Sequence, residues 1–317
     1  MTRHKRRVLF VYKRSARKWG STVMRADMIV NFAAPRLGER YNFQLSALPS
    51  SRIPGAQALW RRLLRRGDIA ILTKHAALAA PPDLLRSLQD RGVGVVIDHV
   101  DANLSETLGL PADVHMACSY ASLREIERQL DEGKRESASQ PVAALLHHNV
   151  DDRIYALPRC QTNGLRTVYF GRAYLTVHSP AIEQRVDFLD ASSNESMELN
   201  HRSLPEYNLH YCIRKEERQL GPQQFKPFTK GFTAAACGAN VIVNRDVDDV
   251  MDFLTDDYPY LLDGVDEEEI LAGLEKAMKT FGGPEWIHAQ RIMKHVADQV
   301  SPDALAAQLS DVLRLFD

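Results

Sequence analysis

Two lysines and a threonine precede an alanine-rich segment in the stretch KPFTKGFTAAACGANVI, residues 226–242. The alanines predict a closely packed helix that ends at Gly238, followed by a buried strand, NVIVN. The first turn of a helix has unpaired N–H groups and a partial positive charge, so cations there need a reason such as a bound anion. A phosphate cradle would consist of Lys226, Thr229, Lys230 and the backbone of Gly231. The alternative is that both lysines are solvated in a loop before a structural helix.

The elements that would hold such a site alternate between strand and helix. In the first half, strands are predicted at 7–12, 43–48 and 68–74, a fourth strand with its following loop at 93–103, and a fifth strand in the stretch 141–154. Helices are predicted between them, at 23–38, 55–67, 82–92 and 119–136. Apolar runs that alternate with amphipathic segments are typical of a parallel, doubly wound α/β sheet.

The alternation begins again after residue 160. Strands are predicted at 166–171, 184–190, 209–214, 240–245 and 259–263, and helices at 267–279, 285–299 and 303–316. The polar stretch 191–206 is assigned only as loop or short helix. The chain length of 317 residues also favours two domains.

Charge divides the chain at about the same place. Residues 1–150 hold 23 Lys and Arg against 14 Asp and Glu, whereas residues 151–317 hold 17 against 27. We expect an N-terminal domain at 1–153, a second domain at 160–300 and a final helix at 301–317 that packs back on the first. A basic first half indicates an anionic partner, although two oppositely charged domains that merely face each other would look the same.

Doubly wound sheets bind ligands at the carboxyl ends of their strands, where the strand order reverses. In the first half we expect this crevice between the loops after the first and fourth strands. These loops contribute Arg14, Arg17, Lys18, Gly20, Asp98, His99 and Asp101. In the second half, Gly171, Arg172 and Arg214 lie at the carboxyl ends of predicted strands, where a guanidinium could bind phosphate. Each arginine could equally form a surface salt bridge, and Asp98 and His99 could be hydrogen-bonded loop residues.

The second half resembles the glycosyltransferases of the GT-B fold. The similarity rests on YFGR, LHYCIRK, KPFTKGFTAAACGANVI and DDYPYLLDG, and LLHHNVDDRI is similar to the segment that ends the first domain of these enzymes. The resemblance implies two doubly wound, Rossmann-like domains that face each other across a cleft. It also implies a nucleotide-diphosphate sugar as donor substrate, with no further cofactor and no metal. One departure is Thr233, which stands where many of these enzymes have a ribose-binding glutamate.

Under this resemblance, each group of residues receives a role. Gly171, Arg172, Arg214, Lys226, Thr229, Lys230 and Gly231 would bind the donor. Arg14, Arg17, Lys18 and Gly20 would bind a glycan, lipid-linked or small-molecule acceptor, with Asp98 or His99 at the reacting centre as general base. The expected function is a glycosyltransferase, for example in polysaccharide biosynthesis. Two alternatives stay open: a catalytically silent subunit that binds a glycan or a partner, and a sugar-nucleotide epimerase.

Other classes fit less well. GxGxxG does not follow the first strand and GxxxxGK[ST] does not occur, which argues against a dinucleotide-dependent oxidoreductase and a P-loop nucleotidase. The four cysteines form no CxxC pair, so the sequence predicts neither a zinc site nor a disulfide framework, and a cytoplasmic location is expected. Nucleic-acid binding is not expected, because the basic loops lack interleaved aromatic residues.

Residues 55–67, GAQALWRRLLRRG, predict a basic amphipathic helix. Leu59, Trp60, Leu63 and Leu64 recur at helical spacing, with four arginines between and after them. Such an apolar stripe most often packs on the sheet and leaves its arginines in solvent. The alternative is a peripheral contact with the inner face of the membrane.

Overall fold

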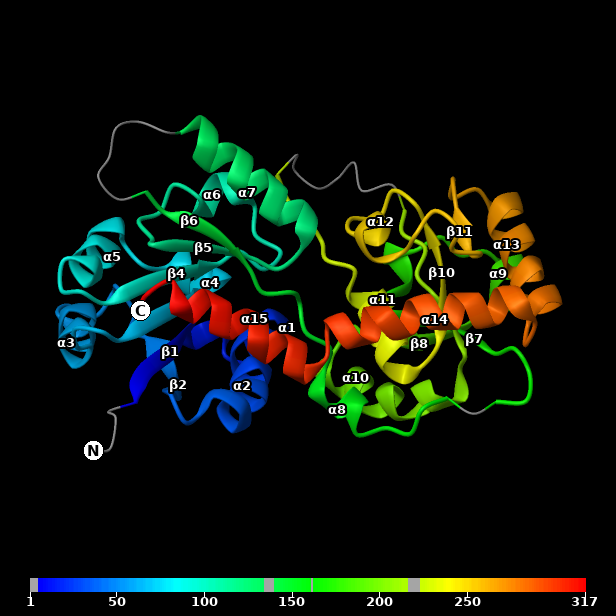
Figure 1. Ribbon diagram of the computed structural model, residues 1–317, viewed down its shortest axis with the longest axis horizontal. Coiled ribbons are helices and arrows are strands. Elements are labelled where there is room, and N and C mark those ends of the chain that lie inside the picture. Colours follow the sequence, from blue (N-terminus) through cyan, green and yellow to red (C-terminus); the bar gives the residue numbers. More distant parts are fainter. Residues whose placement is uncertain (1–4, 134–139, 161, 216–222) are drawn as a thin grey trace. The chain divides into compact units, whose positions relative to one another are not determined.

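The computed structural model describes residues 5–133, 140–160, 162–215 and 223–317, which fold into two compact units (Figure 1). The first unit comprises Met1–Asn149, Leu220–Pro227 and Pro302–Asp317, and the second comprises Val150–Gln219 and Phe228–Ser301. The short segment Leu220–Pro227 therefore belongs to the first unit, although its sequence neighbours on both sides belong to the second.

A parallel sheet of six strands forms the centre of the first unit, in the order β2-β1-β3-β4-β5-β6. Its strands are β1 Arg6–Lys13, β2 Tyr41–Leu48, β3 Ile69–Thr73, β4 Gly94–Asp98, β5 Val114–Ala117 and β6 Val142–Leu145. All five residues of β3 are buried, as expected for a central strand covered on both faces. Leu72 and Ile97 pack with Trp60 and Leu64 in one of the cores of this unit.

The helices of the first unit follow its strands along the chain. They are η1 Arg14–Ala16, α1 Gly20–Thr22, the π-helix η2 Val23–Met28, α2 Ile29–Leu37, α3 Ala56–Leu63, α4 Lys74–Ala77, α5 Pro82–Gln89, α6 Leu104–Thr107, α7 Tyr120–Glu132 and α15 Pro302–Arg314. The C-terminal helix α15, red in Figure 1, packs against α2 within this unit.

The predicted strands of the first half are confirmed, but one strand was missed. β5 has only four residues, and it includes His115 between Val114 and Met116. A short strand with a histidine and no β-branched run does not stand out from its sequence. The strand is nevertheless fully buried, because it lies between β4 and β6.

The second unit has its own parallel sheet, in the order β11-β10-β9-β7-β8. Its strands are β7 Thr167–Gly171, β8 Asp187–Asp190, β9 Leu209–Tyr211, β10 Asn240–Asn244 and β11 Leu261–Leu262. Its helices are α8 Asp152–Tyr155, η3 Ala173–Leu175, α9 Pro180–Glu183, α10 Asn194–Asn200, η4 His201–Glu206, α11 Thr229–Cys237, α12 Val250–Phe253, α13 Glu267–Thr280 and α14 Pro284–Gln299. The polar stretch 191–206 thus holds two short helices.

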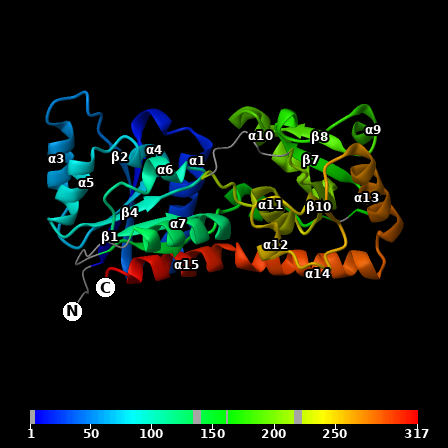
Figure 2. The ribbon, with the colours of Figure 1, turned by 90° about the horizontal axis from the view of Figure 1, so that it is seen from above.

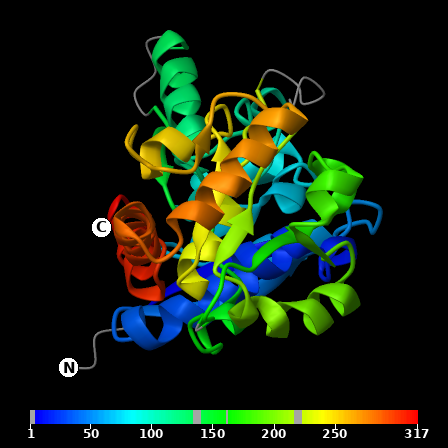
Figure 3. The ribbon, with the colours of Figure 1, turned by 90° about the vertical axis from the view of Figure 1, so that its right-hand side faces the viewer.

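Helices cover both faces of the second sheet. Figure 2 shows α14 on one side of its strands and α10 on the other, and in Figure 3 α13 lies nearest the viewer. The alanine-rich helix α11 packs against both α14 and β10. It ends, as predicted, at Gly238, whose φ of 75° lies in the left-handed region that favours glycine. Small side chains allow α11 to approach its neighbours closely, so the position of its first turn is set by packing.

Candidate functional site

A pocket of about 280 Å³ opens at the carboxyl ends of β7 and β9. These two strands are neighbours, and the strand order of the second sheet reverses between them, as doubly wound folds require of a ligand site. The first turn of α11 completes the wall. The lining consists of Phe170, Gly171, Arg172, Leu175, Ala191, Met197, His210, Tyr211, Cys212, Thr229, Lys230 and Thr233. The structure therefore brings together four of the predicted donor-binding residues: Gly171, Arg172, Thr229 and Lys230.

Lys230 crosses from α11 to the end of β7. Its ammonium nitrogen donates a hydrogen bond of 2.8 Å to the carbonyl oxygen of Phe170 and lies 4.4 Å from the ring centroid of Tyr169. A Cβ atom at Gly171 would lie only 2.3 Å from this nitrogen and 3.0 Å from the Tyr169 hydroxyl. Glycine is thus needed at position 171 so that the ammonium group can lie against the strand.

The surroundings of Lys230 disfavour its charged form. Burial, together with the positive charge of Arg214, lowers the pKa of Lys230 from 10.5 to about 8. The ammonium group is still mostly protonated at pH 7. It has one carbonyl and one aromatic face as partners, so an anion in the pocket would offer it a stronger, charge-assisted hydrogen bond.

The first turn of α11 presents backbone donors to the same pocket. The helix begins at Thr229, which lines the pocket with Lys230, and it has neither a side-chain cap nor an acidic residue in its first turn. The N–H groups of such a turn and the helix dipole favour a bound anion. Thr229, Lys230 and the N-terminus of a helix therefore lie on one wall of the pocket.

Gly231 lies against a buried aromatic ring, and its predicted contact with a phosphate stays a prediction. A Cβ atom at this position would lie 2.1 Å from two ring carbons of Phe228, which is itself buried. The absent side chain makes room for this ring, which occupies the space on the Cβ side of the glycine. Gly231 is therefore a packing residue at the start of α11.

Two further predicted donor residues do not line the pocket. Arg214 follows β9, and its backbone N–H donates to the Asn244 side chain over 2.9 Å, while its charge reaches Lys230. Lys226 belongs to the segment Leu220–Pro227, which is part of the first unit. Arg172 does line the pocket, is exposed, and donates to the hydroxyl of Tyr174 over 3.3 Å.

His210 is a pocket residue that the sequence did not single out. Its side chain is buried, its Nε2 atom has no hydrogen-bond partner among the described residues, and burial beside Lys230 lowers its pKa to about 3. The imidazole is therefore neutral at pH 7 and offers an unused polar atom. Its only sequence signal is its place within a predicted strand, LHYCIR. Thr233 also lines the pocket and contributes a hydroxyl in place of a carboxylate.

In the first unit, Asp98 forms a buried ion pair. Its two carboxylate oxygens accept hydrogen bonds of 2.9 and 3.2 Å from Nε and Nη2 of Arg25, and both side chains are fully buried. Arg25 lies on the π-helix η2 and also donates to the carbonyl oxygens of Leu146 and His147. This guanidinium thus joins η2 to β4 and to the end of β6. Asp98 has no exposed surface for a substrate, so the structure gives its predicted catalytic role no support.

His99 is likewise occupied within the first unit. Its Nδ1 lies 2.8 Å from the Thr107 hydroxyl and its Nε2 lies 2.9 Å from Nδ1 of His115. Burial, with the neighbouring His115, lowers the pKa of His99 to about 3, and burial lowers that of His115 to about 4. Both rings are neutral at pH 7 and act as internal hydrogen-bonding groups. The prediction that His99 serves as a general base stays without support.

The loop after β1 carries the predicted acceptor-side residues. Arg14 and Lys18 are exposed, whereas Arg17 forms a salt bridge with Asp27 and lies over the Tyr12 ring. Gly20 begins α1, and a Cβ atom there would meet nothing within 4 Å, so no contact requires a glycine. The loop is thus basic and accessible, with two of its cations directed outward.

The crevice of the first sheet lies between different strands from those expected. Its strand order reverses between β1 and β3, which pair directly, and not between β1 and β4. Trp19 in the loop after β1 contacts His75 in α4, with ring centroids 4.5 Å apart. Strand order depends on pairing across the sheet, which the hydrophobic pattern of each strand does not determine.

Solved structures with the same architecture cover almost the whole chain. HepE from Anabaena, in complex with UDP, is 12% identical with a TM-score of 0.64, and the match covers 97% of this chain and 99% of that one. A glycosyltransferase from Rickettsia africae is 8% identical with a TM-score of 0.64, covering 99% of both chains. The chain has the GT-B fold.

One of the similar structures is a domain of a protein named for a phosphatase activity. The N-terminal domain of a trehalose-6-phosphate phosphatase from Candida albicans matches with a TM-score of 0.64 at 10% identity, over 100% of this chain and 98% of that one. No protein-family model matches the sequence, and the comparison with curated proteins found no match. The fold is therefore established by structure, and the activity must be argued from the site.

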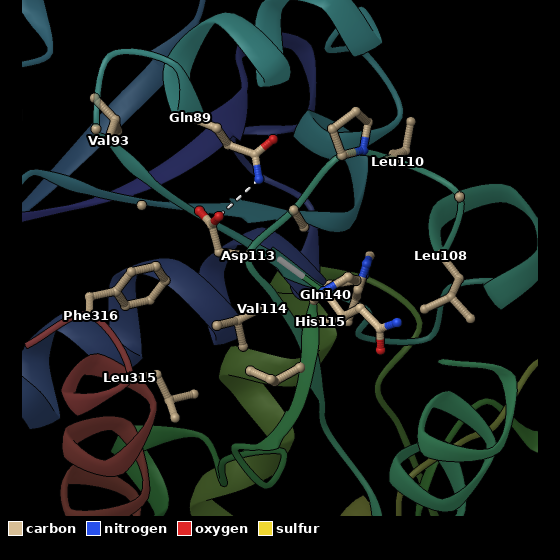
Figure 4. A pocket seen from close by; sticks show the side chains of 17 residues that line it. Gln89, Val93, Leu108, Leu110, Asp113, Val114, His115, Gln140, Leu315 and Phe316 are labelled. Carbon is tan, nitrogen blue, oxygen red and sulfur yellow. Dashed lines mark hydrogen bonds between the residues drawn. The ribbon is translucent and has the colours of Figure 1, made fainter. Parts of the chain in front are cut away.

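A second, larger hollow of about 730 Å³ lies in the first unit (Figure 4). It is found at the amino ends of β4, β5 and β6, the edge opposite to the one where doubly wound sheets bind ligands. Asp113 accepts a hydrogen bond of 2.9 Å from Gln89, and Phe316 fills the space beside Gly94. None of the residues predicted for a site lines this hollow.

The described residues form neither a metal-binding cluster nor a membrane-spanning helix. Within the described ranges, no three His, Cys, Asp or Glu side chains gather as metal ligands would. No helix in the part of the chain that the structure describes is long and apolar enough to cross a lipid bilayer.

Proposed function

We propose that the protein is a glycosyltransferase that takes its sugar from a nucleoside diphosphate and binds the diphosphate in the pocket of the second unit. One observation carries the proposal: Thr229, Lys230 and the first turn of α11 face a pocket at the point where the strand order reverses. The similarity of the fold to HepE, which was solved with UDP, supports the same assignment.

In this proposal the cations also serve the chemistry. When the bond between the anomeric carbon and the diphosphate oxygen breaks, negative charge develops on the leaving diphosphate. The ammonium group of Lys230 and the N–H groups of α11 would stabilise that charge from fixed positions, an effect that needs no movement at the moment of reaction. Arg172, at the exposed side of the pocket, would bind the outer phosphate oxygens. The acceptor would bind to the first unit, at the loop that carries Arg14 and Lys18.

Calorimetric titration with UDP, GDP, ADP and TDP tests the donor site. We expect one of them to bind, and Lys230→Ala to weaken that binding about tenfold or more, because a charge-assisted hydrogen bond is lost. Gly171→Ala should also weaken it, since the added Cβ would displace the ammonium group. Matched controls in the same unit are Lys294→Ala, an exposed lysine on α14, and Gly164→Ala, where a Cβ meets nothing within 4 Å.

A second candidate is a subunit that binds the nucleotide-sugar without turnover. It is favoured by the burial of Asp98 and His99, which leaves both predicted catalytic residues occupied. The two functions differ in one measurement: release of nucleoside diphosphate from a bound nucleotide-sugar in the presence of candidate acceptors. Binding with release supports the transferase, and binding with no release supports the silent subunit. A changed sugar still attached to its nucleotide would identify an epimerase, and no binding by any diphosphate would overturn the donor site.

A further inference from the structure

One face of the helix α3 is apolar and exposed. Leu59 and Leu63, one turn apart, are each 63% exposed, and Ile53 in the preceding turn is 59% exposed. The other half of the expected apolar stripe is buried: Trp60 is 7% exposed and Leu64 1%. The sequence interpretation that the whole stripe packs on the sheet is therefore correct only for its inner half.

The exposed face belongs to a helix that is firmly attached. The indole nitrogen of Trp60 donates a hydrogen bond of 2.9 Å to the Ser46 hydroxyl on β2. At the carboxyl end of the helix, Arg7 donates to the carbonyl oxygen of Leu63 over 2.7 Å, and Arg91 donates to that of Leu64 over 3.3 Å. The outward leucines are thus held in solvent by a fixed scaffold.

Arginines surround this apolar face. Arg52, Arg62, Arg65 and Arg66 are all exposed. No Asp or Glu occurs between Glu39 and Asp68. Asp68 itself is buried and accepts hydrogen bonds from the Arg7 side chain and from the backbone N–H of Arg65. The surface formed by Ile53, Leu59, Leu63 and these four arginines, here called the α3 face, therefore combines exposed apolar side chains with exposed positive charge.

We propose that the α3 face docks on an anionic lipid bilayer. The arginines would lie at the level of the headgroups and the leucines just below them, which matches the layers of such a surface. Each cation near an anionic membrane adds to binding, and so does each apolar side chain that enters the membrane. The proposal does not depend on the diphosphate site, which lies in the other unit.

Other partners fit the α3 face less well. In a symmetric contact with a second copy of the chain, the same arginines would meet each other, and three apolar side chains make a small core for a stable dimer. Single-stranded nucleic acid is usually stacked on exposed aromatic rings, but Trp60, the only aromatic residue of α3, is buried.

Co-sedimentation of the full chain with vesicles tests the proposal. We expect partition onto vesicles of phosphatidylcholine mixed with phosphatidylglycerol, weaker partition onto phosphatidylcholine alone, and weakening by salt. Replacing both Leu59→Asp and Leu63→Asp should lower the partition coefficient about tenfold or more. Arg62→Glu should lower it about fivefold or more. The control is Leu199→Asp on α10, a leucine that is 74% exposed beside Glu198.

Each outcome decides the proposal. All substituted side chains are exposed, so thermal melting should show that the variants remain folded. Loss of partition in both α3 variants but not in the control would support the proposal. It would be overturned if the wild-type chain stayed in solution at low salt, or if the leucine variant partitioned as well as wild type. Self-association in the absence of lipid that Leu59→Asp abolishes would overturn it in favour of a second copy.

Discussion

The surroundings of the Lys230 ammonium group lower its pKa, so both the stability of the fold and the affinity for an anion should depend on pH. Its pKa of about 8 in the folded chain is below the ordinary value of 10.5. Between these two values the unfolded chain binds more protons than the folded one, so this residue makes folding more favourable as pH rises from 8 to 10.5. The affinity for an anion in the pocket should instead fall as pH rises, because the anion binds the charged form of Lys230 better.

Binding of a nucleoside diphosphate should therefore weaken as pH rises above about 8. The phosphate groups are already fully ionised there, and His210, with a pKa of about 3, stays neutral throughout, so Lys230 dominates the change. Calorimetric titration between pH 7 and 9.5 measures it. Lys230→Arg should bind with an affinity that hardly changes over this range, because a guanidinium stays charged. Equal wild-type affinity at both ends would contradict the role of Lys230.

Four residues of the pocket could be predicted from the sequence, because each lies at the end of an element with a clear local pattern. Thr229 and Lys230 were found because they precede an alanine-rich helix, and Gly171 and Arg172 because they end a strand. His210 was missed because its neutrality and its unused nitrogen arise from burial beside Lys230. Asp98 was placed correctly at the end of a strand, but its partner, Arg25, lies 73 positions away, and no local pattern indicates the pair.

At the scale of single elements, α11 depends on a close contact at its first turn. The ring of Phe228 occupies the space beside Gly231, and Phe228 and Phe232 have ring centroids 5.9 Å apart. Gly231→Ala should therefore lower the free energy of unfolding by about 1–3 kcal/mol, through overpacking of a buried ring. Chemical denaturation measures the change.

Gly20→Ala is the matched control for this prediction, because its added methyl group would meet nothing within 4 Å. We expect that variant to remain within about 0.5 kcal/mol of wild type. A Gly231→Ala variant of unchanged stability that no longer binds a diphosphate would show that the phosphate, and not the ring of Phe228, lies beside this glycine.

The order of the elements was less predictable than their existence. Strands as long as β1 and as apolar as β3 are evident from their runs of apolar side chains, whereas β5 is short and contains His115. The reversal between β1 and β3 follows from which strands pair. Pairing is decided by packing between distant segments, so the sequence indicated a doubly wound sheet but misplaced its crevice.

On the scale of the whole molecule, the division of charge near residue 150 agrees with the change of unit between Asn149 and Val150. No comparable change of charge in the sequence indicates that Leu220–Pro227 belongs to the first unit. The two units have separate sheets and separate sites: the Arg25–Asp98 ion pair lies in the first, and the pocket around Lys230 lies in the second. Stability and ligand binding can therefore be perturbed independently.

Asp98→Asn should destabilise the first unit without changing diphosphate binding. The substitution leaves the Arg25 guanidinium fully buried and without its carboxylate, which typically costs about 3–5 kcal/mol. Differential scanning calorimetry should show a lower unfolding temperature, whereas titration at a temperature where the variant is folded should give the wild-type affinity. If Asp98→Asn left the unfolding temperature unchanged but abolished turnover, Asp98 would again be a candidate catalytic residue. Neutralising its carboxylate would then cost no stability, so Arg25 would not require it as a partner.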